Sequence, residues 1–353
     1  MAIPTNGAKK IRVMVVDDSM LARSLIMKGL SAHPQIDVAG FAINTLDARN
    51  KIPQLHPDVI TMDVEMPGQS GIDFLKQYLP TNPVPVILVS SLNLKVFDAL
   101  SAGAVDFVRK PDDHQNADSF IAALTQKVIM AASAKVRTAP AAMTAKQTPA
   151  GPIPLLGGTA ASNRVIVGLG ASTGGTEATL AVMKRLPSDI PPMVIVQHMP
   201  PGFTQMYAER LNRLCAMEVR EAKNGDELHR GLALVAPADL QCRVVRIGTK
   251  YTVSCMPGEK VSGHRPSVDA LFQSMAEVVT CKMVGIIMTG MGQDGAVGLL
   301  AMRKKGAYTI GQDKESSVVY GMPGVAHNIG AVAIQASCDN VSNVLIRHLK
   351  TLG

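Results

Sequence analysis

Short runs of β-branched and aliphatic residues alternate with longer segments of helical period along most of this chain of 353 residues. This alternation is typical of βαβ units wound around a parallel sheet. In the first part of the chain the expected strands are Arg12–Val16, Val38–Ala42, Val59–Met62, Val86–Val89 and Asp106–Val108. The rhythm restarts at Arg164, with strands expected at Val165–Leu169, Met193–Gln197, Ala233–Val235 and Val284–Met288 and helices at Glu177–Leu186 and Val268–Val279. The sequence therefore predicts two α/β domains.

A segment of different composition separates the two parts. Residues 131–162 are rich in Ala, Pro, Thr and Gly, so they cannot bury enough apolar surface to order themselves. We expect a disordered N-terminus at 1–10, an α/β domain with a parallel five-stranded sheet at 11–130, a flexible linker at 131–162 and a doubly wound α/β domain at 163–353. Such a linker keeps two domains at high effective concentration while letting them separate.

Composition and charge exclude several classes of protein. The longest apolar runs are a few residues, far short of the roughly 20 that a membrane-spanning helix needs, and the start MAIPTNGAKK has no export signal. We therefore expect a cytoplasmic protein without membrane insertion. The net charge of +7 arises after residue 130: residues 131–162 hold three basic and no acidic side chains, and residues 163–353 hold 20 basic and 15 acidic ones, whereas residues 1–130 hold 12 basic and 13 acidic ones. This favours an acidic partner, but with 3% aromatic residues and no helix-turn-helix pattern we expect no nucleic acid.

Carboxylates follow two strands of the first expected sheet. Asp17 and Asp18 come directly after the first strand, and Asp63 comes directly after the third. Because the carboxyl ends of neighbouring parallel strands meet at one edge, the three side chains should converge. Crowded carboxylates repel unless a hard dication joins them. The pattern predicts a Mg²⁺ site with Asp63 as phosphoryl acceptor. In the structural alternative, Asp17 and Asp18 cap a helix and Asp63 is a turn residue.

Two further residues of this domain point to the same edge. Ser90 ends the fourth strand and Lys110 follows the fifth, where a hydroxyl and an ammonium could meet phosphoryl oxygens. The motifs DDS, MDVEMPG, VSS and RKP, in this order, closely resemble the flavodoxin-like receiver domain of two-component response regulators. The resemblance implies that a histidine kinase phosphorylates Asp63 and that Ser90, Phe107 and Lys110 form the switch. It also implies a cis peptide bond before Pro111.

The second domain carries a serine in a turn between strand and helix. The segment VIVGLGASTGGTEA puts Ser172 at a helix N-terminus, where backbone N–H groups and the helix dipole favour a developing oxyanion. His198 ends the strand MVIVQ, and Asp294 follows the strand VGIIM. We expect the hydroxyl of Ser172 to contact the imidazole of His198, which Asp294 orients. His264, in HRPSVD, competes as the base, and a helix cap is the structural alternative for Ser172.

Two other motif interpretations of this segment fail. A dinucleotide fingerprint would need a third glycine where Thr173 stands, and an acidic residue where the next strand ends in Gln197. The pattern G-x-S-x-G fits an α/β-hydrolase, but that fold orders its triad Ser, Asp, His, whereas the order here is Ser, His, Asp.

The motifs GASTGGTEA, QHMPPGFT, APAD, HRPSVDALF, TGMGQDGA and QDKESSVVYGMP, in this order, resemble the catalytic domain of the CheB chemotaxis methylesterases. The resemblance implies phosphorylation-activated hydrolysis of glutamate methyl esters, and deamidation of glutamines, on methyl-accepting chemoreceptors, with a chemotaxis histidine kinase as phosphodonor. It makes Ser172 the nucleophile, His198 the base, Asp294 its partner and the N–H of Met291 an oxyanion donor. It implies no cofactor in this domain.

One hypothesis on regulation and two rival functions follow from this pairing of domains. The unphosphorylated receiver is expected to pack over the Ser172 face and to block access until Asp63 is phosphorylated. The rivals are a response regulator whose second domain only binds, such as a transcriptional output, and a phosphorylation-controlled esterase of small molecules.

Overall fold

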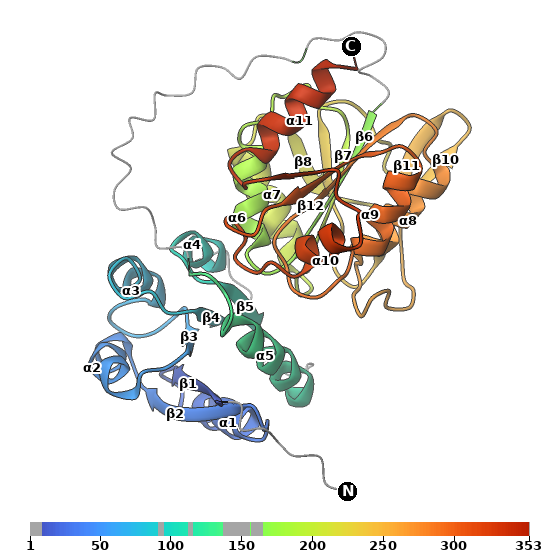
Figure 1. The fold of residues 1–353 in the computed structure, drawn as a ribbon. Helices are drawn as coiled ribbons and strands as arrows, with labels where there is room; N and C mark the ends of the chain where they lie inside the picture. The colour runs from blue at the N-terminus through green and yellow to red at the C-terminus, as the bar shows by residue number, and fades with distance from the viewer. Residues whose placement is uncertain (1–8, 91–94, 112–115, 137–155, 157–164, 353) are drawn as a thin grey trace, which may run out of the picture. The chain divides into compact units, whose positions relative to one another are not determined.

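The computed structural model describes residues 9–90, 95–111, 116–136, 156 and 165–352. It divides into two compact units, Met1–Lys146 and Gln147–Gly353 (Figure 1). Residues 1–8 of the expected disordered N-terminus, and most of the expected linker at 131–162, lie outside the described residues. Within the described ranges, none of the helices combines the length and apolar character that crossing a bilayer requires.

The first unit is a parallel five-stranded sheet in the order β2-β1-β3-β4-β5. Its strands are β1 Ile11–Val16, β2 Ile36–Ala42, β3 Val59–Asp63, β4 Val86–Ser90 and β5 Asp106–Arg109. Its helices are α1 Met20–Ser31, α2 Thr45–Leu55, α3 Gly71–Tyr78, α4 Lys95–Ser101 and α5 Ala117–Ala131. This strand order is flavodoxin-like, so the predicted fold class is confirmed. The order reverses between β1 and β3, whose carboxyl ends carry the acidic residues.

Local signals start the helices of this unit. The hydroxyl of Ser19 accepts the N–H of Ala22 at 3.3 Å and begins α1, and the side chain of Asn116 accepts the N–H of Asp118 at 2.8 Å and begins α5. Helices α1 and α5 pack together, as do α3 and α4. Every residue of β3 and β4 is buried, as expected for parallel strands covered on both faces.

The second unit is a parallel seven-stranded sheet in the order β14-β13-β12-β6-β7-β9-β8, with a separate antiparallel hairpin, β10-β11. Its strands are β6 Val165–Ala171, β7 Met193–Gln197, β8 Glu218–Glu221, β9 Leu232–Val235, β10 Gln241–Ile247, β11 Lys250–Met256, β12 Lys282–Ile287, β13 Tyr308–Gln312 and β14 Ile334–Ala336. Its helices are α6 Gly175–Met183, α7 Phe203–Leu214, α8 Val268–Val278, α9 Ala296–Lys304, α10 Met322–Asn328 and α11 Val341–Lys350.

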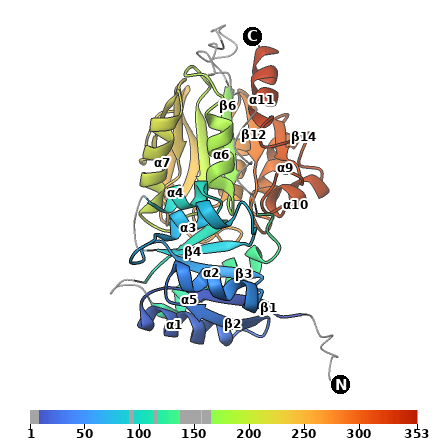
Figure 2. The same cartoon turned by 90° about the vertical axis from the view of Figure 1, so that its left-hand side faces the viewer.

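This second sheet is doubly wound. Helix α6 contacts both α7 and α11, and α6 and α7 can be followed in Figure 2; helix α9 contacts both α8 and α10, which form a second group. The sheet order reverses between β6 and β12, and in open α/β sheets ligands bind at the carboxyl ends of the strands at such a point. The predicted α/β class is confirmed here as well, whereas β8, β13, β14 and the β10-β11 hairpin were not predicted.

Candidate functional site

Three carboxylates meet at the carboxyl ends of β1 and β3. One oxygen from each of Asp17, Asp18 and Asp63 lies within 4.8 Å of the other two. Asp17 and Asp63 are buried, and Asp18 is exposed to solvent. Three hard oxygen donors with one open side fit Mg²⁺, which takes one or two carboxylates and completes its octahedron with water or phosphate oxygens.

Lys110 links two of these carboxylates. Its Nζ lies 2.6 Å from Oδ2 of Asp63 and 2.9 Å from Oδ2 of Asp17. Burial raises the pKa of Asp63, although the nearby ammonium of Lys110 partly offsets the effect. Burial alone would lower the pKa of Lys110, but its hydrogen bonds to Asp17 and Asp63 raise it overall. The ionised carboxylate of Asp63 is therefore destabilised by its surroundings, and a dication would relieve this.

We expect Asp63→Asn to raise the unfolding midpoint of the first unit near neutral pH without metal. An aspartate whose folded pKa lies above the ordinary value of 3.8 contributes full stability below that pH and loses it as the pH rises through the folded pKa. Asparagine has no such proton to lose. Calorimetry in a chelator at pH 7 measures the change, and adding Mg²⁺ should stabilise the wild type more than the variant.

The matched control is Asp118→Asn, which neutralises an exposed carboxylate in the first turn of α5. It removes a carboxylate that favours the helix dipole, so it should lower the metal-free midpoint slightly rather than raise it, and it should leave the Mg²⁺ response unchanged. A lower midpoint for Asp63→Asn would mean that the ion pair with Lys110 outweighs the burial of the carboxylate.

The other predicted switch residues lie along β4 and β5. The buried hydroxyl of Ser90 has no hydrogen-bond partner among the described residues, and its carbonyl accepts the N–H of Lys110 at 2.8 Å. Phe107 is buried in β5. An unpartnered hydroxyl at this edge is free to donate to a phosphoryl oxygen. The peptide bond before Pro111 is not cis, so that implication of the receiver resemblance is wrong.

The second candidate site lies where β6, β7 and β12 end. The last register pair of β6 and β7 joins Ala171 and Gln197, so the next residues, Ser172 and His198, leave the sheet side by side. The N–H of Ser172 donates to the carbonyl of Thr289 at 3.0 Å, which ties the end of β6 to the segment after β12. Strand register thus brings the serine and the histidine to one edge of the sheet.

His198 and Asp294 form a hydrogen-bonded pair. Nε2 of His198 lies 2.8 Å from Oδ2 of Asp294, and the Asp294 side chain is only 1% exposed. Burial raises the pKa of Asp294, but the hydrogen bond from His198 and those from its other donors lower it overall. The carboxylate stays ionised, which favours the tautomer with the proton on Nε2 and leaves Nδ1 of His198 as the basic nitrogen.

The N-terminus of α8 holds this carboxylate in place. Oδ1 of Asp294 accepts the hydroxyl of Ser267 at 2.7 Å and the N–H of Asp269 at 2.9 Å, and Oδ2 accepts the N–H of Val268 at 2.8 Å. Asp269 in turn accepts the N–H of Gly298, in the first turn of α9, at 2.7 Å. Asp294, which precedes α9, therefore caps the start of α8, and Asp269, in the first turn of α8, caps the start of α9.

The other half of the triad is not hydrogen-bonded in this structure. Nδ1 of His198 is buried and has no hydrogen-bond partner among the described residues, so the expected hydrogen bond with the hydroxyl of Ser172 is not formed. Such contacts are often long in free enzymes and shorten when substrate binds. The basic nitrogen thus has no competing partner among the described residues, and the half-buried Ser172 follows the strand next to that of His198.

The loop after β12 reaches the serine. A Cβ atom added to Gly290 would lie only 2.8 Å from Cβ of Ser172, so the loop packs directly on the serine. Within the described part of the chain, the N–H of the next residue, Met291, makes no backbone hydrogen bond. An unpaired N–H so close to the nucleophile can donate to the oxyanion that forms when Ser172 attacks a carbonyl carbon.

Some residues of this site were missed by the sequence reasoning. Ser267 lies in the motif HRPSVDALF, but no function was predicted for it, although a serine directly before a helical run is a typical N-cap signal. Thr289, which accepts the N–H of Ser172, carried no signal. His264, considered only as a rival base, stacks on His198 with ring centroids 3.8 Å apart and an angle of 8° between the planes.

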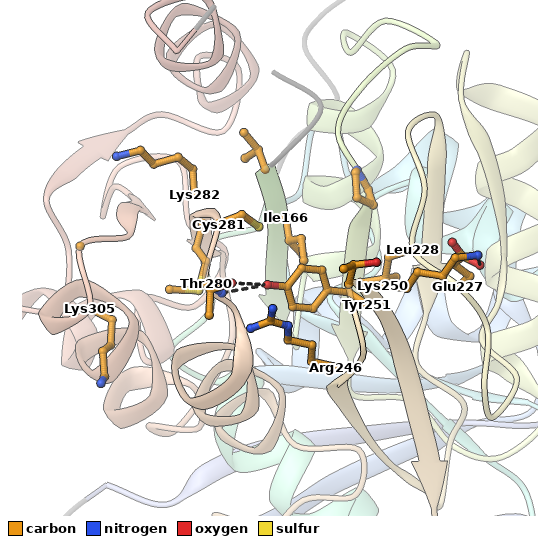
Figure 3. Close-up of a pocket in the computed structure, with 15 residues that line it drawn as sticks. Ile166, Glu227, Leu228, Arg246, Lys250, Tyr251, Thr280, Cys281, Lys282 and Lys305 are labelled. Atoms are coloured by element: carbon orange, nitrogen blue, oxygen red, sulfur yellow. Dashed lines mark hydrogen bonds and ion pairs between the residues drawn. The ribbon is translucent and has the colours of Figure 1, made fainter. Parts of the chain in front are cut away.

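A pocket of about 1070 Å³ lies elsewhere in this unit, at the amino ends of β6 and β12 (Figure 3). Tyr251 projects into it, and its hydroxyl accepts the N–H of Thr280 at 2.9 Å. Because β6 and β12 run parallel, this end of the sheet is opposite to the carboxyl ends that carry Ser172. The pocket is therefore separate from the candidate active site.

Comparison with known proteins matches each unit to a family. Residues 13–122 match the response regulator receiver domain family, and residues 167–345 match the CheB methylesterase family. A protein-glutamate methylesterase/protein-glutamine glutaminase of Syntrophomonas wolfei is 47% identical over 98% of this chain and 99% of its own length. One from Salmonella typhimurium is 42% identical over 96% of each chain. The crystal structure of the Thermotoga maritima CheB methylesterase catalytic domain covers 52% of this chain and 97% of its own, with 34% identity and a TM-score of 0.51.

The two folds and their sites define a response regulator whose output domain is a carboxylic ester hydrolase. The chain belongs to the CheB methylesterase family, as the resemblance of its motifs predicted.

Proposed function

We propose that this protein is a phosphorylation-activated protein-glutamate methylesterase and protein-glutamine deamidase. It acts in the cytoplasm on methyl-accepting chemoreceptors, during adaptation in bacterial chemotaxis. The observation that best supports the hydrolytic role is the hydrogen bond between His198 and the buried Asp294, at the reversal point of the sheet where Ser172 follows the neighbouring strand. The excess of basic over acidic side chains in residues 163–353 suits glutamate-rich receptor helices.

Acyl transfer starts at Ser172. Nδ1 of His198 takes the hydroxyl proton as Oγ of Ser172 attacks the γ-carbonyl carbon of the substrate. The N–H of Met291 donates to the oxyanion of the tetrahedral intermediate. His198 then gives its proton to the leaving group, which departs as methanol from an ester or as ammonia from an amide.

Water completes the reaction. His198 takes a proton from a water molecule that attacks the acyl-enzyme, and it returns that proton to Oγ of Ser172 as the glutamate is released. Throughout, Asp294 holds the imidazole and stabilises its charged form. The two reactions differ only in the leaving group, so one set of residues serves both.

The first domain would control access to this site. A chemotaxis histidine kinase donates its phosphoryl group to Asp63, and Asp17, Asp18 and Asp63 would hold the Mg²⁺ that neutralises charge around that group. The hydroxyl of Ser90 and the ammonium of Lys110 are placed to bind phosphoryl oxygens. The unphosphorylated receiver would cover the Ser172 face, and phosphorylation would release it.

A comparison of three proteins tests this function. With methylated receptor membranes, a small acyl phosphate and Mg²⁺ should increase methanol release by the full chain, but not by Asp63→Asn. Residues 163–353 alone should release methanol faster than the unphosphorylated full chain. Equal or slower release by the fragment would contradict the autoinhibition. Fast cleavage of soluble esters with none of receptors would instead favour a small-molecule esterase.

A further inference from the structure

His264 contacts the catalytic base face to face. The rings of His264 and His198 lie nearly parallel, 3.8 Å apart between centroids. His198 itself is held by a hydrogen bond at Nε2 only, because Nδ1 has no partner among the described residues. A ring held at one atom can still tilt about that hydrogen bond. A flat ring packed against one face restricts this tilt.

The backbone around His264 is firmly anchored. It exchanges two hydrogen bonds with Val261, of 2.9 and 3.0 Å, across a two-residue turn whose residues both have positive φ, 51° at Ser262 and 82° at Gly263. The hydroxyl of Ser262 donates to Oδ2 of Asp269 at 2.7 Å. The turn is therefore tied to the same helix start that holds the catalytic carboxylate.

A buried glutamine joins this turn to the cap of α8. Nε2 of Gln241 donates to the carbonyl of His264 at 3.0 Å, and Oε1 accepts the N–H of Ser267 at 3.0 Å. Ser267 donates its hydroxyl to Asp294. The stacked ring and the carboxylate are thus set by one hydrogen-bonded frame, and both act on His198.

We propose that His264 is a positioning residue that holds the plane of the His198 ring so that Nδ1 stays directed at Ser172. This proposal rests on the proposed function of the triad. The contact needs a flat ring of the right size at position 264, and not a second base. Its effect falls on the rate of proton transfer, because His264 acts through His198 rather than on the substrate.

Two substitutions separate this role from others. His264→Ala removes the flat surface and should lower kcat about 10- to 100-fold with little change in KM, the loss expected from small misplacement of a catalytic group. His264→Phe restores a flat ring without a titratable nitrogen and should recover kcat to within a few-fold of wild type. The matched control is His229→Ala, an exposed histidine that should leave kcat unchanged.

Two readouts on the full chain distinguish the possible failures. One is methanol release from methylated receptors, and the other is the rate at which a fluorophosphonate, which needs only an activated serine, labels Ser172. If Ser172 is labelled fast but no methanol is released, methylated receptors are not the substrate. The labelling rates of the variants at position 264 then still test the positioning role. The melting midpoint of each variant reports its folding.

The positioning role would be overturned by a wild-type labelling rate in His264→Ala, or by a His264→Phe variant no better than alanine. Complete loss of labelling in folded His264→Phe would instead make His264 the base. If the Ser172→Ala variant is still labelled, Ser172 is not the reactive serine, and both the proposed triad and the positioning role of His264 are wrong.

Discussion

Ser172→Ala should lower kcat for methanol release by about a million-fold, which brings it below detection in an assay with methylated receptor membranes. Without Oγ no acyl-enzyme can form, and the paired His198 and Asp294 have no nucleophile to activate. The loss should appear in kcat, because receptor binding does not depend on one hydroxyl. Methanol release measures the loss of catalysis, and a receptor pull-down shows whether receptor binding is unchanged.

The control for this variant is another serine-to-alanine change in the same domain. Ser342 is fully buried at the start of α11, and its hydroxyl has no hydrogen-bond partner among the described residues. Ser342→Ala should therefore keep the wild-type kcat. Substantial methanol release by folded Ser172→Ala would remove the assignment of the nucleophile.

Asp294→Asn should lower kcat by about 10⁴-fold, the size of effect seen when the carboxylate of a serine triad becomes an amide. An amide nitrogen facing Nε2 of His198 would favour the opposite tautomer, which puts the proton on Nδ1 and leaves no base for Ser172. Steady-state kinetics on the phosphorylated full chain, with methylated receptor membranes as substrate, would measure the change.

Asp189→Asn is the matched control for this change. Asp189 is a half-buried aspartate that precedes β7, at the edge of the sheet opposite to His198, and its carboxylate accepts a hydrogen bond from Arg230 at 2.9 Å. Its substitution should leave kcat of the folded enzyme near wild type. If Asp189→Asn and Asp294→Asn lower kcat equally, the loss reflects a general effect of removing a carboxylate from this domain, and Asp294 does not orient His198.

The parallel strands were predictable because their sequences are continuous apolar runs. Runs such as Val165–Leu169 and Met193–Gln197 are bounded by polar or small residues, and their ends agree with β6 and β7 to within two residues. The β10-β11 hairpin was missed because charged residues interrupt it, as in Gln241–Ile247. Short edge strands such as β14, with three residues, carry too little periodicity to be recognised.

The site was predictable only in part, for a geometric reason. In a parallel sheet, a polar residue directly after a strand lies at the carboxyl edge, so Asp63, Ser172 and His198 could be placed from sequence. The stacking of His264 on His198 depends on how a loop 66 residues further along folds back, which no local pattern encodes. Which nitrogen of His198 faces Asp294 also depends on the tertiary arrangement.

The exchange of caps between α8 and α9 makes assembly of the catalytic base part of folding. Asp294 receives the hydrogen bonds of Ser267, Val268 and Asp269 only when α8 is in place, and the start of α9 needs Asp269 from that same helix. Neither helix can dock completely while the other is loose. The chain would therefore acquire an oriented imidazole in the same step in which these two helices close on the sheet, so a partly folded molecule would carry no hydrolytic activity.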